Sequence, residues 1–207
     1  MRTHTKETQD SLTPELALEI LKEGNTRFVN NIKAHRNLLE QVNETSYGQF
    51  PFAAILSCID SRISAELVFD QGLGDIFSIR IAGNILNEDI LGSMELACKV
   101  SGSKLIVVLG HNKCGAIESA CNNISMGNIT SLLNKIKPAI DMETTTTTNR
   151  NGKNDVFVTN VSINNIFLTV KKIREQSKLL AEMELNRQIK IISALYDIDT
   201  GKVVFYD

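Results

Sequence analysis

The sequence predicts an α/β protein, a single domain with a mostly parallel central β-sheet flanked by helices. Short apolar runs at 51–57, 75–82 and 104–110 have the length of strands, and stretches with helical periodicity separate them. Hydrophobic residues make up 43% and charged residues 22% of the 207 residues, which is typical of one globular domain with a buried core. We therefore expect one domain over 1–207, with an N-terminal helical arm and a C-terminal hairpin.

The chain begins with a polar segment, and we expect a flexible tail over 1–12. Thr13, Pro14 and Glu15 then form a helix start. They supply a hydroxyl that can cap the helix, a proline at the first helical position and an acid near the positive end of the helix dipole. Apolar residues follow at helical spacing, which predicts a helix over about 14–32.

The middle of the chain reads as strands and helices in alternation. Apolar, often β-branched runs predict strands, and apolar residues three or four positions apart predict helices. In order, these are a strand at 51–57, a short helix at 65–71, a strand at 75–82, a helix at 88–100, a strand at 104–110 and a helix that begins within 113–123. This alternation is typical of parallel strands joined by helical connections.

The second half of the chain is expected to continue with helices and to close with two strands. Pro138 is expected to end a helix that begins near 129, and the run Thr144–Thr148 lies in an expected exposed loop at 142–154. The remaining elements are a helix at 156–176, a second helix capped by Ser177 that extends to Glu184, a strand at 187–198 and a hairpin closed by 202–207.

Cysteine and histidine side chains follow two of the predicted strands. Cys58 comes directly after the first strand, and His111 and Cys114 follow the third in the spacing H-x-x-C. Because α/β sheets bind ligands beyond the carboxyl ends of their parallel strands, we expect these three side chains to lie together. Zinc binds thiolate and imidazole readily, and three protein ligands leave a fourth position for water. The sequence therefore predicts a zinc site with an open position.

Asp60 and Arg62 lie just beyond Cys58 and are expected to reach the metal site. A guanidinium paired with the Asp60 carboxylate would keep it ionised and oriented, so that it can accept a hydrogen bond from the water or hydroxide at the fourth position. If Arg62 releases it, Asp60 can become the fourth ligand and close the site. The other two cysteines, Cys98 and Cys121, are expected to pack in the core.

These residues resemble the signature motifs of the β-class carbonic anhydrases. CIDSR at 58–62 and HNKCGA at 111–116 match the C-x-D-x-R and H-x-x-C motifs of that family. GDIFSIRIAGN at 74–84 is similar to the stretch between them, and ALYDIDTGKVVF at 194–205 resembles the closing hairpin. The resemblance implies the reversible hydration of CO₂ to bicarbonate and a proton by zinc-bound hydroxide.

The same resemblance implies roles for individual residues. It implies one Zn²⁺ per subunit with Cys58, His111 and Cys114 as ligands, and it implies Asp60 and Arg62 as the catalytic pair. The substrate-binding residues that it implies are Gln49, Phe77 and Gly115. It also implies a homo-oligomer, a dimer or a tetramer, in which the amide of Gln49 reaches the substrate across the interface.

Two other readings use the same site. Relatives with this metal motif hydrolyse carbonyl sulfide or carbon disulfide, and a zinc hydroxide in an apolar pocket would attack either molecule. The second alternative is a zinc protein without turnover, in which Asp60 remains on the metal as a fourth ligand and closes the site. An Arg62 that holds the carboxylate away from the metal argues against this closed form.

Composition also bears on partners and location. The formal net charge of −2 gives no reason to expect nucleic acid or an anionic membrane as a partner. No apolar run is long enough for a signal-peptide core or a membrane-spanning helix, so we expect a cytoplasmic protein. Its four cysteines are then expected as thiols or thiolates and not as disulfides.

Overall fold

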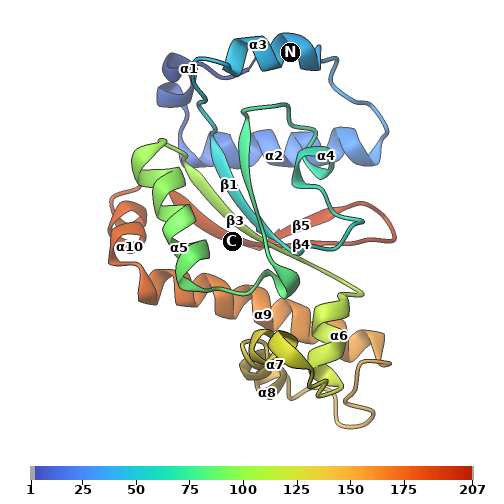
Figure 1. Ribbon diagram of the computed structural model, residues 1–207. Coiled ribbons are helices and arrows are strands. Elements are labelled where there is room, and N and C mark those ends of the chain that lie inside the picture. The colour runs from blue at the N-terminus through green and yellow to red at the C-terminus, as the bar shows by residue number, and fades with distance from the viewer. Residues whose placement is uncertain (1–2, 207) are drawn as a thin grey trace.

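The computed structural model describes residues 3–206, and within them the predicted fold class is confirmed (Figure 1). A five-stranded sheet runs through the molecule in the order β2-β1-β3-β4-β5. Its strands are β1 (Ala53–Ser57), β2 (Ile76–Arg80), β3 (Leu105–His111), β4 (Lys190–Tyr196) and β5 (Val203–Tyr206). The first four are parallel, and β5 pairs antiparallel with β4 as the predicted hairpin. Residues 1–2 of the expected tail and residue 207 of the hairpin lie outside the described residues.

Helices cover both faces of the sheet, because successive residues of a buried strand point to opposite sides. In β1, Ala53 and Ile55 face one apolar core, whereas Ala54 and Leu56 face the other. The first core is closed by α2 (Pro14–Val29) and α4 (Ala65–Val68), and the second by α5 (Glu88–Glu95), α9 (Asp155–Gln176) and α10 (Lys178–Leu185). In Figure 1, α2 and α9 lie on opposite sides of the sheet.

A third apolar cluster includes Cys58, just beyond the carboxyl end of β1. The helices that build it are α6 (Gly115–Cys121), α7 (Gly127–Asn134), α8 (Lys137–Met142) and the beginning of α9, which gather at the bottom of Figure 1. Cys121 is buried in this cluster, and Cys98 is buried in the core beneath α9. Both cysteines therefore pack in the interior, as the sequence predicts.

Pro138 begins a helix instead of ending one. The sequence predicts a single helix from near 129 to Pro138, and this prediction is wrong. The chain forms two helices, α7 and α8, and Pro138 occupies the first turn of α8. Proline is well tolerated there because the first N–H groups of a helix have no partner within the helix.

The N-terminal segment is helical where the sequence indicates a flexible tail. Helix α1 (Lys6–Ser11) begins at a capping box. Its Gln9 is fully buried, and the side-chain amide donates to the carbonyl oxygens of Pro51 and Ser101, each at 2.8 Å. The expectation of a flexible tail over 1–12 is therefore wrong for this helix. One buried amide anchors a segment that is otherwise polar, and apolar periodicity does not report such an anchor.

Helix α3 (Leu38–Thr45) is a second element that the sequence pattern did not indicate. Gln41 is its buried residue, and the side-chain oxygen accepts a hydrogen bond from the Leu73 amide at 3.2 Å. The apolar side chains of this helix face outward, and Leu39 is 78% exposed. A helix of eight residues is marginal as an isolated peptide, and its apolar face is not packed in the core of this chain, so contacts such as that of Gln41 fix it in place.

The predicted loop at 142–154 is mostly exposed, but it is fastened by one buried acid. Glu143 directly follows α8 and accepts hydrogen bonds from the amides of Thr145 and Thr146 at 3.1 and 3.0 Å. Arg150 closes the loop with an ion pair to the same carboxylate at 2.7 Å. Burial alone would raise the pKa of Glu143, but the hydrogen bonds outweigh it and hold the pKa at about 2.

The long helix predicted at 156–176 is confirmed as α9. Ser177 caps α10 as predicted, since its hydroxyl accepts a hydrogen bond from the Leu180 amide at 3.1 Å. No helix within residues 3–206 combines the length and the apolar character needed to cross a membrane.

Asp70 joins the N-terminal arm to the sheet domain, and its removal should weaken the fold in a pH-dependent way. Its carboxylate pairs with Arg27 at 2.5 Å and with Arg36 at 2.6 Å, and the Arg36 side chain is buried. Burial would raise the pKa of Asp70, but the hydrogen bonds from Arg27, the Ala34 amide and Arg36 outweigh it and keep the pKa below its usual value. We expect Asp70→Asn to lower the free energy of unfolding by about 3 kcal/mol at neutral pH, because the buried Arg36 and the half-buried Arg27 lose their partner.

The pH dependence of this effect has a definite sign. A depressed pKa stabilises the fold above the unfolded value, about 3.9 for Asp, and that stabilisation is lost as the pH falls through the folded value. Urea unfolding of the wild type and Asp70→Asn should therefore show a difference in the free energy of unfolding at neutral pH, and this difference should become smaller below about pH 4. A difference in unfolding free energy that stays constant from neutral pH to below about pH 4 would contradict the ion-pair explanation.

Two helical glycines should respond to alanine in opposite directions. A Cβ added at Gly24 in α2 would lie 1.8 Å from the carbonyl oxygen of Phe69, whereas one added at Gly92 in α5 would meet nothing within 4 Å. Gly24→Ala must displace backbone, and we expect a loss of about 3 kcal/mol in unfolding free energy. Gly92→Ala should gain roughly 0.5–1 kcal/mol from helix propensity. Chemical unfolding of both variants measures these changes in unfolding free energy. Equal changes for Gly24→Ala and Gly92→Ala would contradict the close packing of α2.

Candidate metal centre

The predicted ligands meet where β1 and β3 end side by side. The chain leaves β1 toward β2 on one side and later places β3 on the other side of β1. Such a change of direction opens a crevice between neighbouring strand ends, and α/β sheets bind ligands there. Cys58 directly follows β1, and His111 is the last residue of β3. The parallel register pairs Ser57 with Leu109, so both strands end at the same edge.

Cys58, His111 and Cys114 form a compact buried group that fits a zinc ion. One ligand atom from each residue lies within 4.8 Å of the other two. The two sulfur atoms are 3.9 Å apart, and two thiolates bound tetrahedrally at about 2.3 Å from one zinc ion would lie roughly 3.8 Å apart. None of the three residues is more than 4% exposed. The structure thus brings together the three residues that the sequence predicts.

The ring of His111 is oriented by the neighbouring backbone. Its Nδ1 lies 2.8 Å from the carbonyl oxygen of Asn112, which can only accept a hydrogen bond. Nδ1 therefore donates this hydrogen bond, and Nε2 is the nitrogen left to bind a metal. Nε2 is buried and has no hydrogen-bond partner among the described residues. A buried lone pair beside two sulfur atoms is the arrangement expected of a metal ligand.

Several groups stabilise a thiolate at Cys58. The nearby thiol of Cys114 lowers the pKa of Cys58 against the effect of burial, and the imidazole of His111 acts in the same direction. The Gly83 amide donates a hydrogen bond to the sulfur at 3.3 Å, and the Asp60 amide also favours the thiolate. The Cys58 sulfur and burial together raise the pKa of Cys114. The pair therefore retains one proton by itself, and a bound cation favours the loss of that second proton.

Asp60 and Arg62 form the ion pair that the sequence predicts. Arg62 donates from Nε to Oδ1 at 2.9 Å and from Nη2 to Oδ2 at 2.7 Å, which fixes the plane of the carboxylate. These hydrogen bonds lower the pKa of Asp60 to about 2. Arg62 also donates to the carbonyl oxygen of Lys113 at 3.1 Å. This contact ties the turn after β1 to the turn that carries His111 and Cys114.

Arg80 supports the same turn and was missed in the sequence. Its Nε donates to the carbonyl oxygen of Cys58 at 3.1 Å, and its Nη2 donates to the carbonyl oxygen of Asp60 at 2.8 Å. The position of Arg80 offers a usable signal, because it is the last residue of β2, which ends at the same edge of the sheet. An arginine there can reach the carbonyl groups of the neighbouring turn.

Asn112 is a second supporting residue that the sequence did not reveal. Its side-chain oxygen accepts a hydrogen bond from the Ile198 amide at 2.8 Å, and its nitrogen donates to Asp197 at 3.3 Å. These contacts connect the turn after His111 to the turn between β4 and β5. A polar residue beside a histidine is too common a pattern to predict this role.

The three predicted substrate-binding residues do not gather at this centre within one chain. Gln49 precedes β1, and Phe77 lies near the start of β2, where it pairs with Ala54. Both are therefore roughly 13 Å or more, measured along the strands, from the edge that carries Cys58. Gly115 does lie at the centre, because it begins α6 directly after the ligand Cys114, and nothing would lie within 4 Å of an added Cβ.

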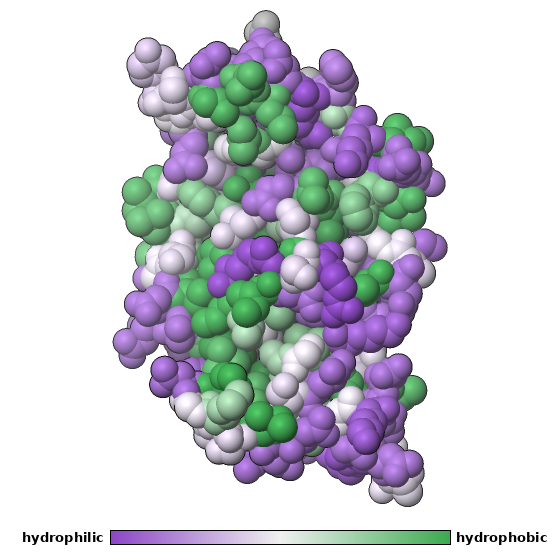
Figure 2. All heavy atoms as spheres, turned by 45° about the vertical axis from the view of Figure 1, so that its right-hand side comes forward, coloured by the Kyte–Doolittle hydropathy of each residue, from purple (hydrophilic) through white to green (hydrophobic). Residues whose placement is uncertain are grey.

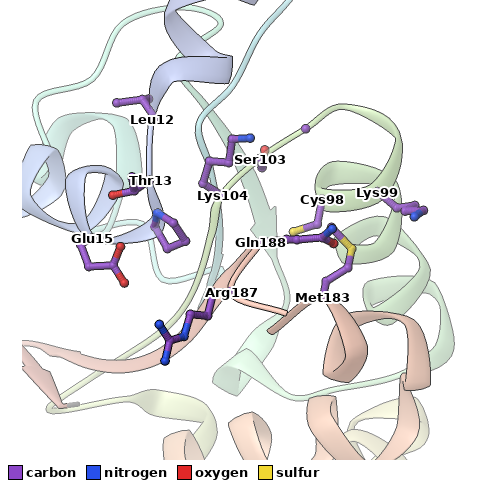
Figure 3. A pocket seen from close by; sticks show the side chains of 12 residues that line it. Leu12, Thr13, Glu15, Cys98, Lys99, Ser103, Lys104, Met183, Arg187 and Gln188 are labelled. Atoms are coloured by element: carbon purple, nitrogen blue, oxygen red, sulfur yellow. The ribbon is translucent and has the colours of Figure 1, made fainter. Parts of the chain in front are cut away.

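A cavity of about 710 Å³ lies at the opposite edge of the sheet (Figure 3). Ser103 and Lys104 line it just before β3 begins, and Gln188 lines it just before β4. Figure 3 shows Gln188 beside Cys98. His111 stands at the far end of β3, roughly 20 Å from the start of the strand. The cavity is therefore separate from the metal centre.

Comparisons with known proteins agree with this geometry. A family model described as carbonic anhydrase matches residues 53–203. Carbonic anhydrase 2 of Mycobacterium tuberculosis is 33% identical over 202 residues, which cover 94% of this chain and 93% of that protein.

Solved structures share the fold of this chain. The β-carbonic anhydrase CafA of Aspergillus fumigatus has a TM-score of 0.71 at 21% identity and covers 93% of this chain and 90% of its own. A β-carbonic anhydrase of Sordaria macrospora, from a pair described as tetrameric, has a TM-score of 0.68 at 20% identity and covers 80% of this chain and 89% of its own. Because the family model matches most of the sequence and the M. tuberculosis relative aligns along nearly its whole length, this chain belongs to the carbonic anhydrase family, with the fold of the β class.

Proposed function

We propose that this chain is a zinc-dependent carbonate dehydratase that converts CO₂ and water reversibly to bicarbonate and a proton. The observation that carries the proposal is the buried group of Cys58, His111 and Cys114 beside the ion-paired carboxylate of Asp60. Hydration of CO₂ is the reaction of the family to which the chain belongs.

Each subunit would hold one Zn²⁺ through Cys58, His111 and Cys114. A zinc ion with three protein ligands lowers the pKa of a water molecule at its fourth position and so supplies a nucleophile near neutral pH. The two thiolates offset the positive charge that produces this effect. The Gly83 amide donates a hydrogen bond to the Cys58 sulfur at 3.3 Å and so withdraws negative charge from this thiolate.

Asp60 would act as the catalytic residue that orients a proton. Oδ1 accepts hydrogen bonds from both the backbone amide and the Nε of Arg62, whereas Oδ2 accepts one from Nη2 and keeps a lone pair for a further donor. With a pKa of about 2, the side chain does not retain a proton at neutral pH. Asp60 would therefore accept a hydrogen bond from the water or hydroxide that reacts with CO₂ and so orient it. Arg62 keeps the acceptor in position.

We propose that a second copy of this chain completes the substrate pocket. Gln49 and Phe77 lie away from the Cys58 edge of their own chain, so they can contact CO₂ or bicarbonate only across an interface between subunits. Gly115 would belong to the pocket of the chain that holds the metal. The pocket would thus draw on residues of two subunits.

The surface supports a dimer or a tetramer. The side chains of Leu39 and Tyr47 are 78% and 100% exposed. Figure 2 shows apolar side chains gathered into patches on one face of the molecule, and large contiguous apolar patches mark interaction surfaces. The Sordaria relatives are tetrameric. Light scattering on the purified protein should give twice or four times the 22.9 kDa mass of the chain, and a monomer would contradict this proposal.

Stopped-flow measurement of CO₂ hydration tests the proposed reaction. Turnover should scale with bound zinc and should rise across roughly pH 6.5–9. Protein with one zinc per subunit that shows no turnover at the upper end of this range would contradict the proposal.

Two further measurements distinguish CO₂ hydration from the hydrolysis of other substrates and from a closed, non-catalytic site. Rates on carbonyl sulfide or carbon disulfide that exceed the rate on CO₂ would favour the hydrolase. The closed, non-catalytic form requires Asp60 to leave Arg62, although both of its oxygens accept hydrogen bonds from that guanidinium. A crystal structure of the zinc-loaded protein at about pH 8.5 distinguishes the forms, and Asp60 bound to the metal there would favour the closed one.

We also propose the cytoplasm as the location. None of the four cysteines, all of which lie within the described residues, forms a disulfide, as is usual in a reducing compartment. Cell fractionation checks this, and recovery in a secreted fraction would contradict it.

A further inference from the structure

Asn165 is a buried polar residue on α9 whose side chain is directed at the turn beside the metal centre. It is only 2% exposed, and its Nδ2 donates a hydrogen bond to the carbonyl oxygen of Gly83 at 2.9 Å. Burying an amide without need is unfavourable, so a buried asparagine in the middle of a long helix usually has a specific partner. Here the partner is a residue that itself contacts Cys58.

Gly83 connects Asn165 to the sulfur. Its carbonyl accepts from Asn165, and its amide donates to the Cys58 sulfur at 3.3 Å. The residue has φ +65°, a conformation that glycine adopts with little strain. A Cβ there would lie 2.9 Å from a methyl carbon of Ile136 and 3.3 Å from the Ala116 side chain. The Gly83 peptide is therefore fixed by Asn165 at its carbonyl and contacts Cys58 through its amide, and the space at its Cα is too small for a side chain.

We propose that Asn165 is a positioning residue for the metal centre: by holding the Gly83 peptide it keeps an N–H donor directed at the Cys58 thiolate. The proposal rests on the zinc site proposed above. A hydrogen bond to a metal-bound thiolate withdraws charge from sulfur, and this tunes both the affinity for the metal and the acidity that the metal can induce. The neighbouring asparagine, Asn164, makes a hydrogen bond of the same kind to Ala139 at 3.3 Å, away from the ligands.

Asn165→Leu tests the proposal, because leucine has a similar volume and no donor. We expect zinc affinity to fall by about 10–100-fold, measured by competition with a chelator. In Co²⁺-substituted protein, the sulfur-to-cobalt charge-transfer band should move to lower energy, because a sulfur without its hydrogen bond releases charge more readily. Loss of packing alone would not move this band in a fixed direction. Asn165→Ala, which imposes no new bulk, should shift the band the same way.

Asn164→Leu is the matched control on the same helix. It should lower thermal stability to a comparable degree but leave the cobalt spectrum and zinc affinity within about twofold of the wild type. If folded Asn165→Leu and Asn165→Ala both keep the wild-type band, or if Asn164→Leu shifts it equally, the positioning role is wrong. A wild type that binds neither zinc nor cobalt would instead contradict the proposed metal site itself.

Discussion

Replacing Cys114 by serine is expected to remove zinc and activity together. Serine preserves the size of the side chain, but its hydroxyl keeps its proton at neutral pH and is a poor ligand for zinc. The variant should retain well under one zinc per subunit, and CO₂ hydration should fall by more than about 100-fold. Metal analysis after dialysis and stopped-flow assays on the same samples measure both quantities.

Cys121→Ser is the matched control for this variant. Cys121 lies at the other end of α6 and is buried in the same apolar cluster, so the chemical change and the burial are alike. It should lose some stability because a hydroxyl is buried in an apolar environment, yet it should keep its zinc. Full zinc retention in Cys114→Ser, or equal zinc loss in both variants, would contradict the assignment of Cys114 as a ligand.

Asp60→Asn is expected to separate metal binding from turnover. The amide of asparagine can present only one oxygen to Arg62, and its NH₂ group cannot accept the second hydrogen bond that Asp60 Oδ2 receives at 2.7 Å. The group that orients the reacting O–H is then lost, while Cys58, His111 and Cys114 are unchanged. We expect zinc content near one per subunit and kcat reduced by about 100-fold.

A neutralised carboxylate elsewhere near the centre controls for simple loss of charge. Asp199 pairs with Lys113 at 2.5 Å, and both side chains are largely exposed. Asp199→Asn removes the same charge without touching the pair of Asp60 and Arg62, so kcat should change by less than about threefold. Equal losses in the two variants would show that charge, and not the oriented acceptor, is what matters.

The ligand cluster could be predicted from sequence because its members follow strand ends. Cys58 and His111 mark the ends of two apolar runs, and parallel strands place such ends at one edge. The strand order was not available from this pattern, and only the structure shows that β1 and β3 are neighbours. Local signals of this kind describe a strand and its end, not its neighbours.

The supporting contacts could not be predicted because they depend on distant packing. Asn165 and Gly83 are 82 residues apart, and the direction in which α9 presents its amide is set only when the helix packs on the sheet. Gln9 is similar, since one buried amide in a polar segment leaves no periodic pattern. Hydrophobic periodicity reports which face is buried, and it does not report which buried polar atom finds which partner.

The strand order also has a consequence for biosynthesis. All three ligands and both ligand-bearing strands lie within residues 53–121, whereas β4 is added only after the connection at 112–189. Closing that connection instead of the one at 58–104 costs only about half a kcal/mol more in loop entropy, so chain length alone does not dictate the order of assembly. Synthesis itself favours early folding of the ligand-bearing half, because this half emerges from the ribosome first. Helix α9, which supplies Asn165 and part of the apolar cluster around Cys58, is synthesised later, so the complete surroundings of the ligands form only after the second half of the chain has emerged.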